Sequence, residues 1–304
     1  MSAVTTATDV LARTTAVNGF NMANIVTSRL MTAGAAQSSN VPARAGLSQY
    51  AAMDFSKLEQ DYEGLERFLV NVAAGSLRGL IVTGPPGVGK TTSVTRILNQ
   101  HATGPHKVVA GHMSVITLYS ELYRHRNPGQ IIVLDDVDSA FKSMEGINIV
   151  KAAADSVPQR RISWATCSPV LKAWNIPQTF NYDGEIILIS NETQRKGRQS
   201  KLSQHIAAVA DRLHTVSLGS NDKAEQFHQL CYQVVHGGLL DSRGLTPPQQ
   251  CDVLDYISEN FDELERVSLR TATKIAELMR LEPQHWRSMA NIGVLNSIDH
   301  AGGN

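Results

Sequence analysis

Apolar residues recur along most of this chain in two patterns, short uninterrupted runs and longer stripes with helical spacing. Residues 55–75 carry apolar side chains every three or four positions and end at Gly75, which predicts a helix. Strands are predicted at five short apolar runs, residues 79–84, 106–111, 130–136, 184–191 and 214–218. Helical stripes such as 90–102 and 114–126 separate these runs. Alternating strands and helices predict an α/β fold, a three-layer αβα core around a parallel five-stranded sheet.

The strand pattern stops after Leu218. Residues 220–238, 246–261 and 268–281 are typical of helices, and Thr246 is expected to cap the second of them before two prolines. The predicted organisation is therefore a nucleotide-binding core over residues 53–218, a small all-α lid domain over 219–296, and a disordered tail over 297–304.

Residues 1–52 differ in composition from the rest of the chain. They are rich in Ala, Thr and Ser, and Asp9 is their only acidic residue. We interpret them as a flexible arm whose few apolar residues dock on a partner or a neighbouring subunit. An Arg- and Ser-rich, acid-poor segment is also typical of a transit peptide, which stays open as the alternative.

Overall charge gives no argument for nucleic-acid binding, since 28 Lys and Arg balance 28 Asp and Glu. The three cysteines lie far apart and match no zinc or redox spacing, which favours a reduced, intracellular setting. Since no apolar run approaches the length of a membrane-spanning helix, we expect no membrane association.

The stretch GPPGVGKTT follows a predicted strand and opens a predicted helix. It fits the pattern G-x-x-x-x-G-K-[ST] at every position, and its glycines leave backbone N–H groups free to wrap phosphates. We expect Lys90 to reach the β- and γ-phosphates and the Thr91 hydroxyl to bind Mg²⁺. The nucleotide-binding residues of this loop are predicted to be Gly84, Pro85, Pro86, Gly87, Val88, Gly89, Lys90, Thr91 and Thr92.

Polar side chains follow two further buried strands. Asp135 and Asp136 end the run IIVLDD, where ionised carboxylates need a partner, and Mg²⁺ supplies one. Asp135 is the expected metal ligand, and Asp136 is expected to orient or deprotonate the attacking water. Asn191, at the end of the run 184–191, is expected to hold that water and to touch the γ-phosphate. Asp138 is interpreted mainly as a helix N-cap.

Together these motifs resemble the AAA+ ATPases. The family's Walker A motif resembles Gly84 to Thr91, its Walker B motif resembles Ile131 to Asp136, and its sensor 1 residue resembles Asn191. The sequence of residues 62–91 and 179–191 is also similar to that of small single-ring ATPases encoded by tailed phages and mobile elements. The resemblance covers about residues 54 to 290. It implies ATP and Mg²⁺ as cofactors, a homo-oligomer such as a hexamer, and the cytoplasm, that of the host if the chain is phage-encoded.

The resemblance also assigns roles to two arginines. Arg212, at the end of the helix before the fifth strand, resembles the arginine finger that completes a neighbouring subunit's site in trans. A surface arginine that caps its own helix is the alternative. Arg270 in SLRT resembles the sensor 2 residue that folds the lid onto nucleotide, and an exposed arginine at a helix start is the alternative. Residues 195–201, RKGRQSK, offer rival fingers or a basic loop for a nucleic-acid backbone.

The sequence therefore predicts an ATPase, and three hypotheses stay open for what its hydrolysis does. The first is a phage DNA-related process such as replication, recombination or packaging. The second is protein remodelling or assembly without nucleic-acid contact. The third is a superfamily 3-like helicase, against which the predicted lid argues. Many related ATPases carry Glu where this chain has Asp136, and the shorter side chain predicts slower hydrolysis.

Overall fold

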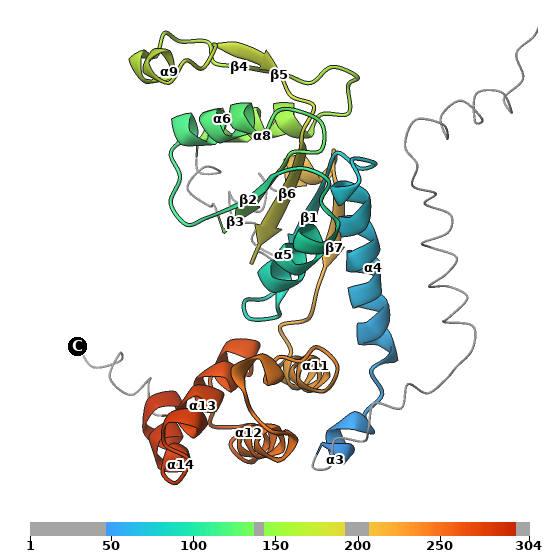
Figure 1. Ribbon diagram of the computed structural model, residues 1–304, viewed down its shortest axis with the longest axis vertical. Coiled ribbons are helices and arrows are strands. Elements are labelled where there is room, and N and C mark those ends of the chain that lie inside the picture. The colour runs from blue at the N-terminus through green and yellow to red at the C-terminus, as the bar shows by residue number, and fades with distance from the viewer. Residues whose placement is uncertain (1–46, 137–142, 192–206, 296–304) are drawn as a thin grey trace, which may run out of the picture. The chain divides into compact units, whose positions relative to one another are not determined.

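Five parallel strands form the central sheet, in the spatial order β2-β3-β6-β1-β7 (Figure 1). The computed structural model describes residues 47–136, 143–191 and 207–295. The strands are β1 (Gly79–Thr83), β2 (His106–Ala110), β3 (Ile131–Asp135), β6 (Glu185–Ser190) and β7 (His214–Ser217). They coincide with the five apolar runs of the sequence, so the predicted α/β sheet and its parallel pairing are confirmed.

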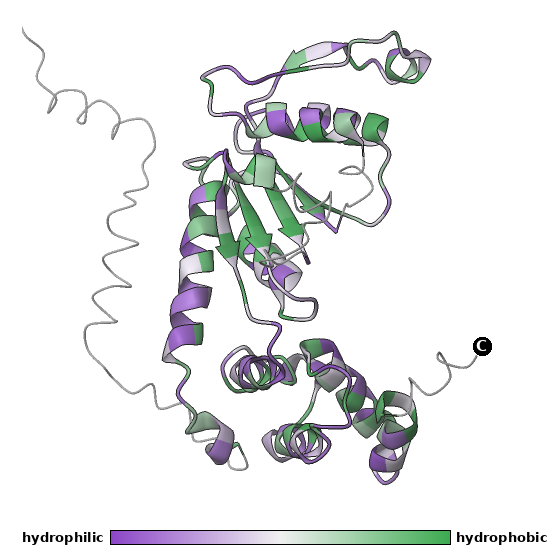
Figure 2. Ribbon diagram, turned by 180° about the vertical axis from the view of Figure 1, so that it is seen from behind, coloured by the Kyte–Doolittle hydropathy of each residue, from purple (hydrophilic) through white to green (hydrophobic). Residues whose placement is uncertain are grey.

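Helices cover both faces of this sheet, because the side chains of a strand point alternately to opposite sides. Leu80 and Val82 of β1 pack among residues of α4 (Ser56–Ala73) and α5 (Lys90–His101). Ile81, between them, packs with residues of α6 (Val115–Arg124) and α8 (Met144–Ala154) on the other side. The three central strands β3, β6 and β1 are mostly hydrophobic in Figure 2, as expected for strands buried on both faces, whereas the edge strands β2 and β7 carry polar residues and are more exposed.

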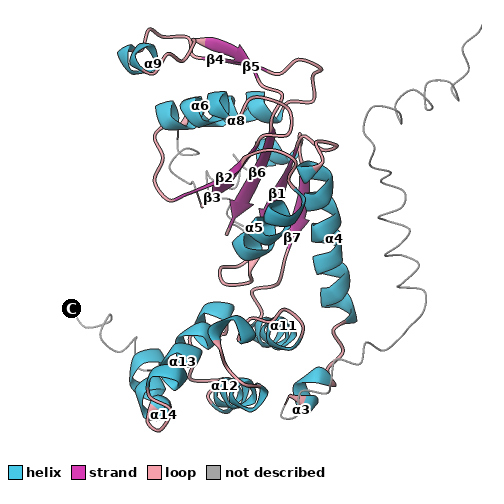
Figure 3. Cartoon of the chain, viewed as in Figure 1, coloured by secondary structure: helices cyan, strands magenta, loops and turns pink. Residues whose placement is uncertain are grey.

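The region after β7 contains helices joined by loops and no strand in the described residues, as Figure 3 shows, and this all-α lid is the second predicted feature that the structure confirms. Its elements are α11 (Lys223–Val235), η1 (Asp241–Arg243), α12 (Pro247–Glu259), α13 (Leu269–Leu281), α14 (Trp286–Ala290) and η2 (Asn291–Leu295). Thr246 is the N-cap of α12 and two prolines follow it. None of the described helices is long and apolar enough to span a bilayer.

Residues 47–52, which fall inside the range expected for the N-terminal arm, contact the lid. Helix α3 (Ser48–Ala51) packs against α11, and both Leu47 and Tyr50 lie in the hydrophobic cluster of the lid. The hydroxyl of Tyr50 donates a hydrogen bond to Asp255 Oδ1 over 2.6 Å. Leu47 and Tyr50 are therefore part of the lid's core.

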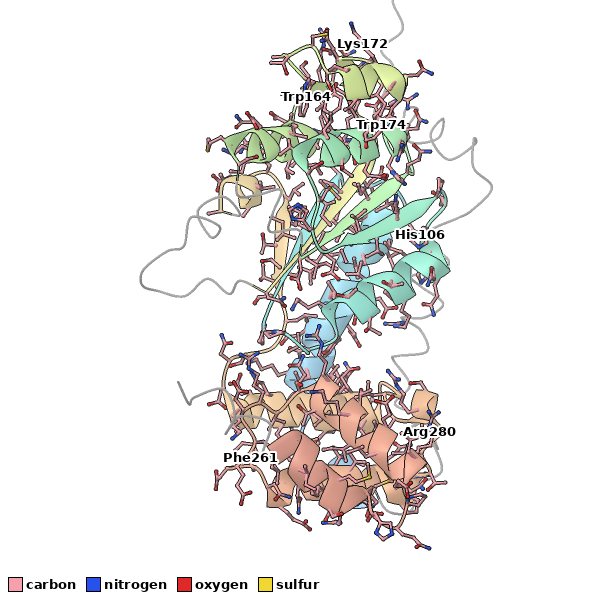
Figure 4. The ribbon with its side chains drawn as sticks, turned by 90° about the vertical axis from the view of Figure 1, so that its left-hand side faces the viewer. His106, Trp164, Lys172, Trp174, Phe261 and Arg280 are labelled. Carbon is pink, nitrogen blue, oxygen red and sulfur yellow. The ribbon has the colours of Figure 1, made fainter. Side chains whose placement is uncertain are left out.

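A small antiparallel hairpin is the element that the sequence pattern did not predict. It pairs β4 (Arg161–Ser163) with β5 (Thr179–Asn181), and α9 (Pro169–Ala173) lies between the two strands. Phe180 of β5 lies edge-on to Tyr119 of α6, with 5.1 Å between ring centroids. This aromatic contact joins the hairpin to the core, whereas Trp174 is 45% exposed (Figure 4).

The register of the strands gathers the polar residues at one edge of the sheet. Thr83 of β1 lies beside Ser190 of β6, and Asp135 of β3 lies beside Ile189 of the same strand. Parallel strands end at a common edge, where ligands of open α/β sheets bind. The phosphate-loop residues, the two aspartates and Asn191 therefore meet there.

Candidate nucleotide-binding site

The phosphate loop connects β1 to α5 through residues 84–89. Gly87 has φ of +81°, a left-handed conformation that residues with a Cβ rarely adopt, and a Cβ there would lie 2.8 Å from the Cβ of Ser268. Helix α5 begins at Lys90, so its free backbone N–H groups and the positive end of its dipole point into the loop. The loop has the local conditions for binding phosphate.

Lys90 is held inside this loop and is only 5% exposed. Its Nζ donates hydrogen bonds to the carbonyls of Gly84 and Pro85, both over 2.9 Å, and to Asn191 Oδ1 over 2.8 Å. Burial lowers the pKa of Lys90 to about 8, and the nearby Asp136 and Asp135 oppose this shift. A bound phosphate would favour the charged form and replace the carbonyl contacts.

Thr91 and Asp135 form an oxygen pair beside the loop. The Thr91 hydroxyl donates to Asp135 Oδ2 over 2.8 Å. Burial is the largest cause that raises the pKa of Asp135, and the neighbouring Asp136 adds to it. Mg²⁺ prefers oxygen ligands and would offset this unfavourable burial of negative charge, so the donor set fits a magnesium ion. Thr91 and Asp135 would hold it.

Asp136 follows β3 with φ of +50°, one of two non-glycine residues with positive φ in the described part of the chain. Short polar side chains tolerate this conformation best. The Nδ2 of Asn191 donates to both carboxylate oxygens of Asp136, each over 2.7 Å. Asn191 thus joins Asp136 to Lys90, and the turn aims the carboxylate at the phosphate loop.

The lid closes against the loop through a backbone hydrogen bond. The N–H of Leu269, the first residue of α13, donates to the carbonyl of Gly87 over 3.0 Å. Ser268 caps this helix by accepting from the backbone N–H of Thr271. Arg270, which follows Leu269 in α13, lines a pocket of about 460 Å³ together with Lys90 and the residues at the carboxyl edge of the sheet.

A second connection between core and lid passes through Gln229 of α11. Its Nε2 donates to the hydroxyl of Tyr62 over 2.8 Å, and that hydroxyl donates to the carbonyl of Val88. Gln229 is 2% exposed, and its Oε1 has no hydrogen-bond partner in the described residues. The phosphate loop is therefore fixed to both the first and the third long helix of the lid.

Two adjoining pockets share four residues and together form an elongated site. The pocket of about 460 Å³ contains the phosphate loop, Asp135, Asp136 and Asn191, and the neighbouring one of about 520 Å³ is bordered by α4, α5 and α11. Tyr62 and Tyr232, stacked with 5.3 Å between ring centroids, line the second pocket. The shared residues are Gly89, Thr92, Leu239 and Leu269. This arrangement suits a ligand with a charged chain and a flat apolar end.

Arg212 lies away from this site. It follows the helical residues 207–210, is exposed, and its Nη1 donates to the carbonyl of Ala208 over 2.6 Å. This is the helix-capping arrangement that the sequence left open as the alternative, and an exposed position is equally compatible with contact to a neighbouring subunit. Asp138 and the basic stretch 195–201 lie outside the described residues.

Several residues of the site were missed by the sequence analysis. Lys274 lies one helical turn after Arg270 and on the same side of α13, so its spacing was a usable signal. Arg243, which also lines the phosphate-side pocket, lies in the short η1 element and carried no signal. Gln229 and Tyr62 were read only as helix residues, because their role depends on how the lid docks.

Part of this chain matches a known protein family, and a larger part aligns with one phage protein. Residues 80–161 match the model of the ATPase family associated with various cellular activities (AAA). The chain is 28% identical over 257 residues to an uncharacterized 36.7 kDa protein of Enterobacteria phage T4, encoded in the nrdC-mobD intergenic region. That alignment covers 79% of each chain.

Solved structures with similarity to the chain have low sequence identity. NtrX from Brucella abortus, in complex with ADP, is 18% identical with a TM-score of 0.46; the match covers 90% of this chain and 60% of that one. The RuvB Holliday junction branch migration motor of Thermotoga maritima is 13% identical with a TM-score of 0.35, and the match covers 73% of this chain and 70% of that one. The replication initiator DnaA, bound to AMPPCP and single-stranded DNA, is 14% identical with a TM-score of 0.39, and the match covers 83% of this chain and 69% of that one. The chain thus spans less than two thirds of the NtrX chain.

Proposed function

We propose that this chain, whose residues 80–161 match the AAA ATPase family model, binds ATP with Mg²⁺ and hydrolyses its γ-phosphate bond. One observation carries the proposal: Asn191 bonds to both Lys90 and Asp136, and this triad lies beside the Thr91–Asp135 pair at the edge of the sheet. A phosphate-binding lysine, a metal pair and a base candidate in one pocket fit phosphoryl transfer to water.

Each residue has a separate task in this proposal. Lys90 binds the β- and γ-phosphates, and Thr91 and Asp135 hold the metal, which neutralises charge on the phosphate oxygens. Asp136 accepts a proton from the attacking water or orients it, and the Asn191 carboxamide fixes the carboxylate and the water relative to Lys90. Arg270, the second cationic side chain with a role, contacts the phosphates from the lid.

We extend the proposal to a homo-oligomer, a hexamer in its simplest form, in which Arg212 completes the site of the next subunit. The support is its exposed position and the family resemblance of the helix end that carries it. A finger that acts in trans stabilises transition-state charge and is worth about 10³- to 10⁵-fold in rate.

For the client of hydrolysis, we propose a DNA-related process of a phage or mobile element. The support is the relative in phage T4 and the basic stretch RKGRQSK at residues 195–201. A protein client is the alternative, which the balanced charge of the chain favours. ATPase activity that rises on adding single- or double-stranded DNA, with a rise that shrinks as salt increases, distinguishes the two, because phosphate contacts weaken in salt.

The basic test of the proposal is a phosphate-release assay with Mg²⁺-ATP on the full chain, its Lys90→Ala variant and a matched Lys172→Ala variant. Lys172 is an exposed lysine of α9 that lines neither of the two adjoining pockets (Figure 4). We expect Lys90→Ala to abolish nucleotide binding or turnover and Lys172→Ala to behave as the wild type. A wild-type chain that neither binds nor hydrolyses ATP would overturn the proposal.

A further inference from the structure

Three cations of the lid face the same pocket as the catalytic edge of the sheet. Arg270 and Lys274 come from α13, one helical turn apart, and Arg243 comes from η1, which packs against α13. They border the pocket whose core side contains Lys90, Asp135 and Asp136.

None of the three lid cations is engaged elsewhere in the described residues. Neither Arg243, Arg270 nor Lys274 has a side-chain hydrogen bond or ion pair there. Some other cations of the described residues do have carboxylate partners. Arg287 bonds to Glu259 over 2.7 Å, and Lys107 lies 3.0 Å from Glu121. Unpaired charges gathered at one pocket indicate a ligand of opposite sign.

The charge of the pocket is unevenly divided between its two halves. The core half holds one lysine against two aspartates, so it is net acidic by one charge, and the lid half adds three positive charges. The whole pocket is therefore positive by two charges. A nucleoside triphosphate with one Mg²⁺ carries about two negative charges, and a diphosphate with Mg²⁺ carries about one. The lid cations bring the charge to balance with a triphosphate only.

Arg243 is the lid cation best suited to sense the third phosphate. Arg270 already interacts electrostatically with Lys90 and Asp135, so its place is next to the phosphate loop. Arg243 reaches the same pocket from a different lid element, and its planar guanidinium offers a fork of donors for phosphate oxygens. Lys274 supplies a point charge without this geometry.

Resting on the proposed function, we infer that Arg243 is a phosphate ligand that favours nucleoside triphosphate over diphosphate, with Arg270 and Lys274 completing a three-cation clamp. Loss of the γ-phosphate then leaves one lid cation without a counter-charge. The lid contacts the phosphate loop through the hydrogen bond from Leu269 to Gly87. The uncompensated positive charge on the lid then weakens the closure of the lid on this loop after hydrolysis.

The test is the dissociation constant of the full chain for ADP and for a non-hydrolysable ATP analogue, both with Mg²⁺, by titration calorimetry. The variants are Arg243→Ala, Arg243→Lys and a matched Arg280→Ala, which removes an exposed arginine of α13 that does not line the pocket (Figure 4). Circular dichroism and the thermal midpoint of each variant verify folding.

We expect Arg243→Ala to weaken binding of the ATP analogue by about 10- to 100-fold, as for loss of a charge-assisted hydrogen bond, and binding of ADP by less than about 3-fold. Arg243→Lys should recover part of the loss, and Arg280→Ala should match the wild type. If the wild type binds both nucleotides and Arg243→Ala weakens the binding of both equally, or of neither, this inference is overturned and the proposed function stands. A wild type that binds no nucleotide overturns the proposed function and the inference with it.

Discussion

Asn191 donates two hydrogen bonds from its Nδ2 to the carboxylate of Asp136, each 2.7 Å long. The two residues come from the ends of neighbouring strands, since β3 pairs directly with β6. The Oδ1 of the same carboxamide accepts from Lys90 Nζ, so one neutral side chain holds the cation proposed to bind phosphate and a candidate base at fixed separation. The geometry of the proposed reaction depends on this amide.

Asn191→Ala should therefore lower turnover more than binding. Positioned donors of this kind are worth about 10²- to 10³-fold in rate, whereas Lys90 keeps its contacts with the loop carbonyls. We expect kcat for ATP to fall by about 100-fold and the dissociation constant to change by a few-fold, measured by steady-state kinetics and titration. Asn181→Ala, on the exposed edge of the hairpin, is the control. Unchanged turnover in Asn191→Ala would contradict the assigned role.

Asp136→Asn should separate binding from chemistry. The amide cannot accept a proton from water, but it has nearly the same size, so the pocket stays intact. We expect tight binding of ATP with turnover reduced by at least about 100-fold, in a nucleotide-binding assay run beside a phosphate-release assay. Asp252→Asn, an exposed residue of the lid, is the matched control. If Asp136→Asn kept full turnover, a residue other than Asp136 would have to accept the proton from the attacking water.

Gly219→Ala should disturb the connection between lid and phosphate loop. A Cβ at Gly219 would lie 2.5 Å from Gln229 Oε1 and 3.0 Å from a methyl group of Val88, and the residue has φ of +69°. Gly111→Ala is the control, because Gly111 has φ of +85° but nothing within 4 Å of its would-be Cβ. Both variants pay about 1 to 2 kcal/mol for the left-handed backbone.

Only Gly219→Ala should in addition weaken nucleotide binding, which a titration with ADP measures. The physical reason is that Gln229 and Val88 belong to the contact that fixes the loop to α11. If Gly111→Ala weakens binding as much as Gly219→Ala, the backbone conformation alone accounts for the effect, and the contact has no part in it.

Hydrophobic periodicity predicted the elements that carry many buried residues. The central strands β1, β3 and β6 are buried runs of four or more residues, and the edge strands β2 and β7 each pair with one of them. The helices of the lid have clear apolar stripes. The hairpin was missed because β4 and β5 have three residues each, too few for a period to emerge. The short η1 element that carries Arg243 escaped for the same reason.

The candidate site was predictable where its residues follow strand ends in sequence, as Asp135, Asp136 and Asn191 do. The contacts among them were not. That Asn191 bridges Lys90 and Asp136 depends on the order β3-β6-β1, in which the last strand in sequence lies in the middle. The left-handed turn at Asp136 likewise follows from tertiary contacts, since its backbone N–H donates to the carbonyl of Ile189.

Glu185 predicts a pH dependence of stability that is independent of the nucleotide site. It lies at the start of β6, is 4% exposed, and its Oε2 has no hydrogen-bond partner among the described residues. Burial raises its pKa from 4.5 to about 7. Between these values the folded state binds more protons than the unfolded state, so stability falls as pH rises through this window. Above about pH 7 the full penalty for burying the carboxylate is present.

Glu185→Gln should accordingly raise the melting temperature by a few degrees at pH 8 and change it little at pH 4.5, since the amide remains neutral. Scanning calorimetry across this range measures the difference. Glu121→Gln is the control of opposite sign, because Glu121 pairs with Lys107 and Arg124 over 3.0 and 2.8 Å. A gain for Glu185→Gln that is the same at both pH values would show that packing, not ionisation, is responsible.

Arg212 provides the sharpest test of shared sites. Its side chain donates to the Ala208 carbonyl of its own helix end, so within one chain it has a capping role worth roughly 0.3 to 1 kcal/mol. If it also completes a neighbour's site, the specific activity of the wild type should rise with protein concentration, and Arg212→Ala should lose about 10³-fold in turnover while binding ATP normally.

A mixing experiment then distinguishes a finger from a cap. Lys90→Ala supplies a subunit with an intact arginine but no nucleotide, and Arg212→Ala supplies a subunit with an intact nucleotide pocket but no finger. Neither variant is active alone in this scheme, yet their mixture should recover measurable ATPase activity, because some interfaces pair an intact pocket with an intact arginine. A mixture no more active than its components, with Arg212→Ala as active as the wild type, would reduce Arg212 to a helix cap.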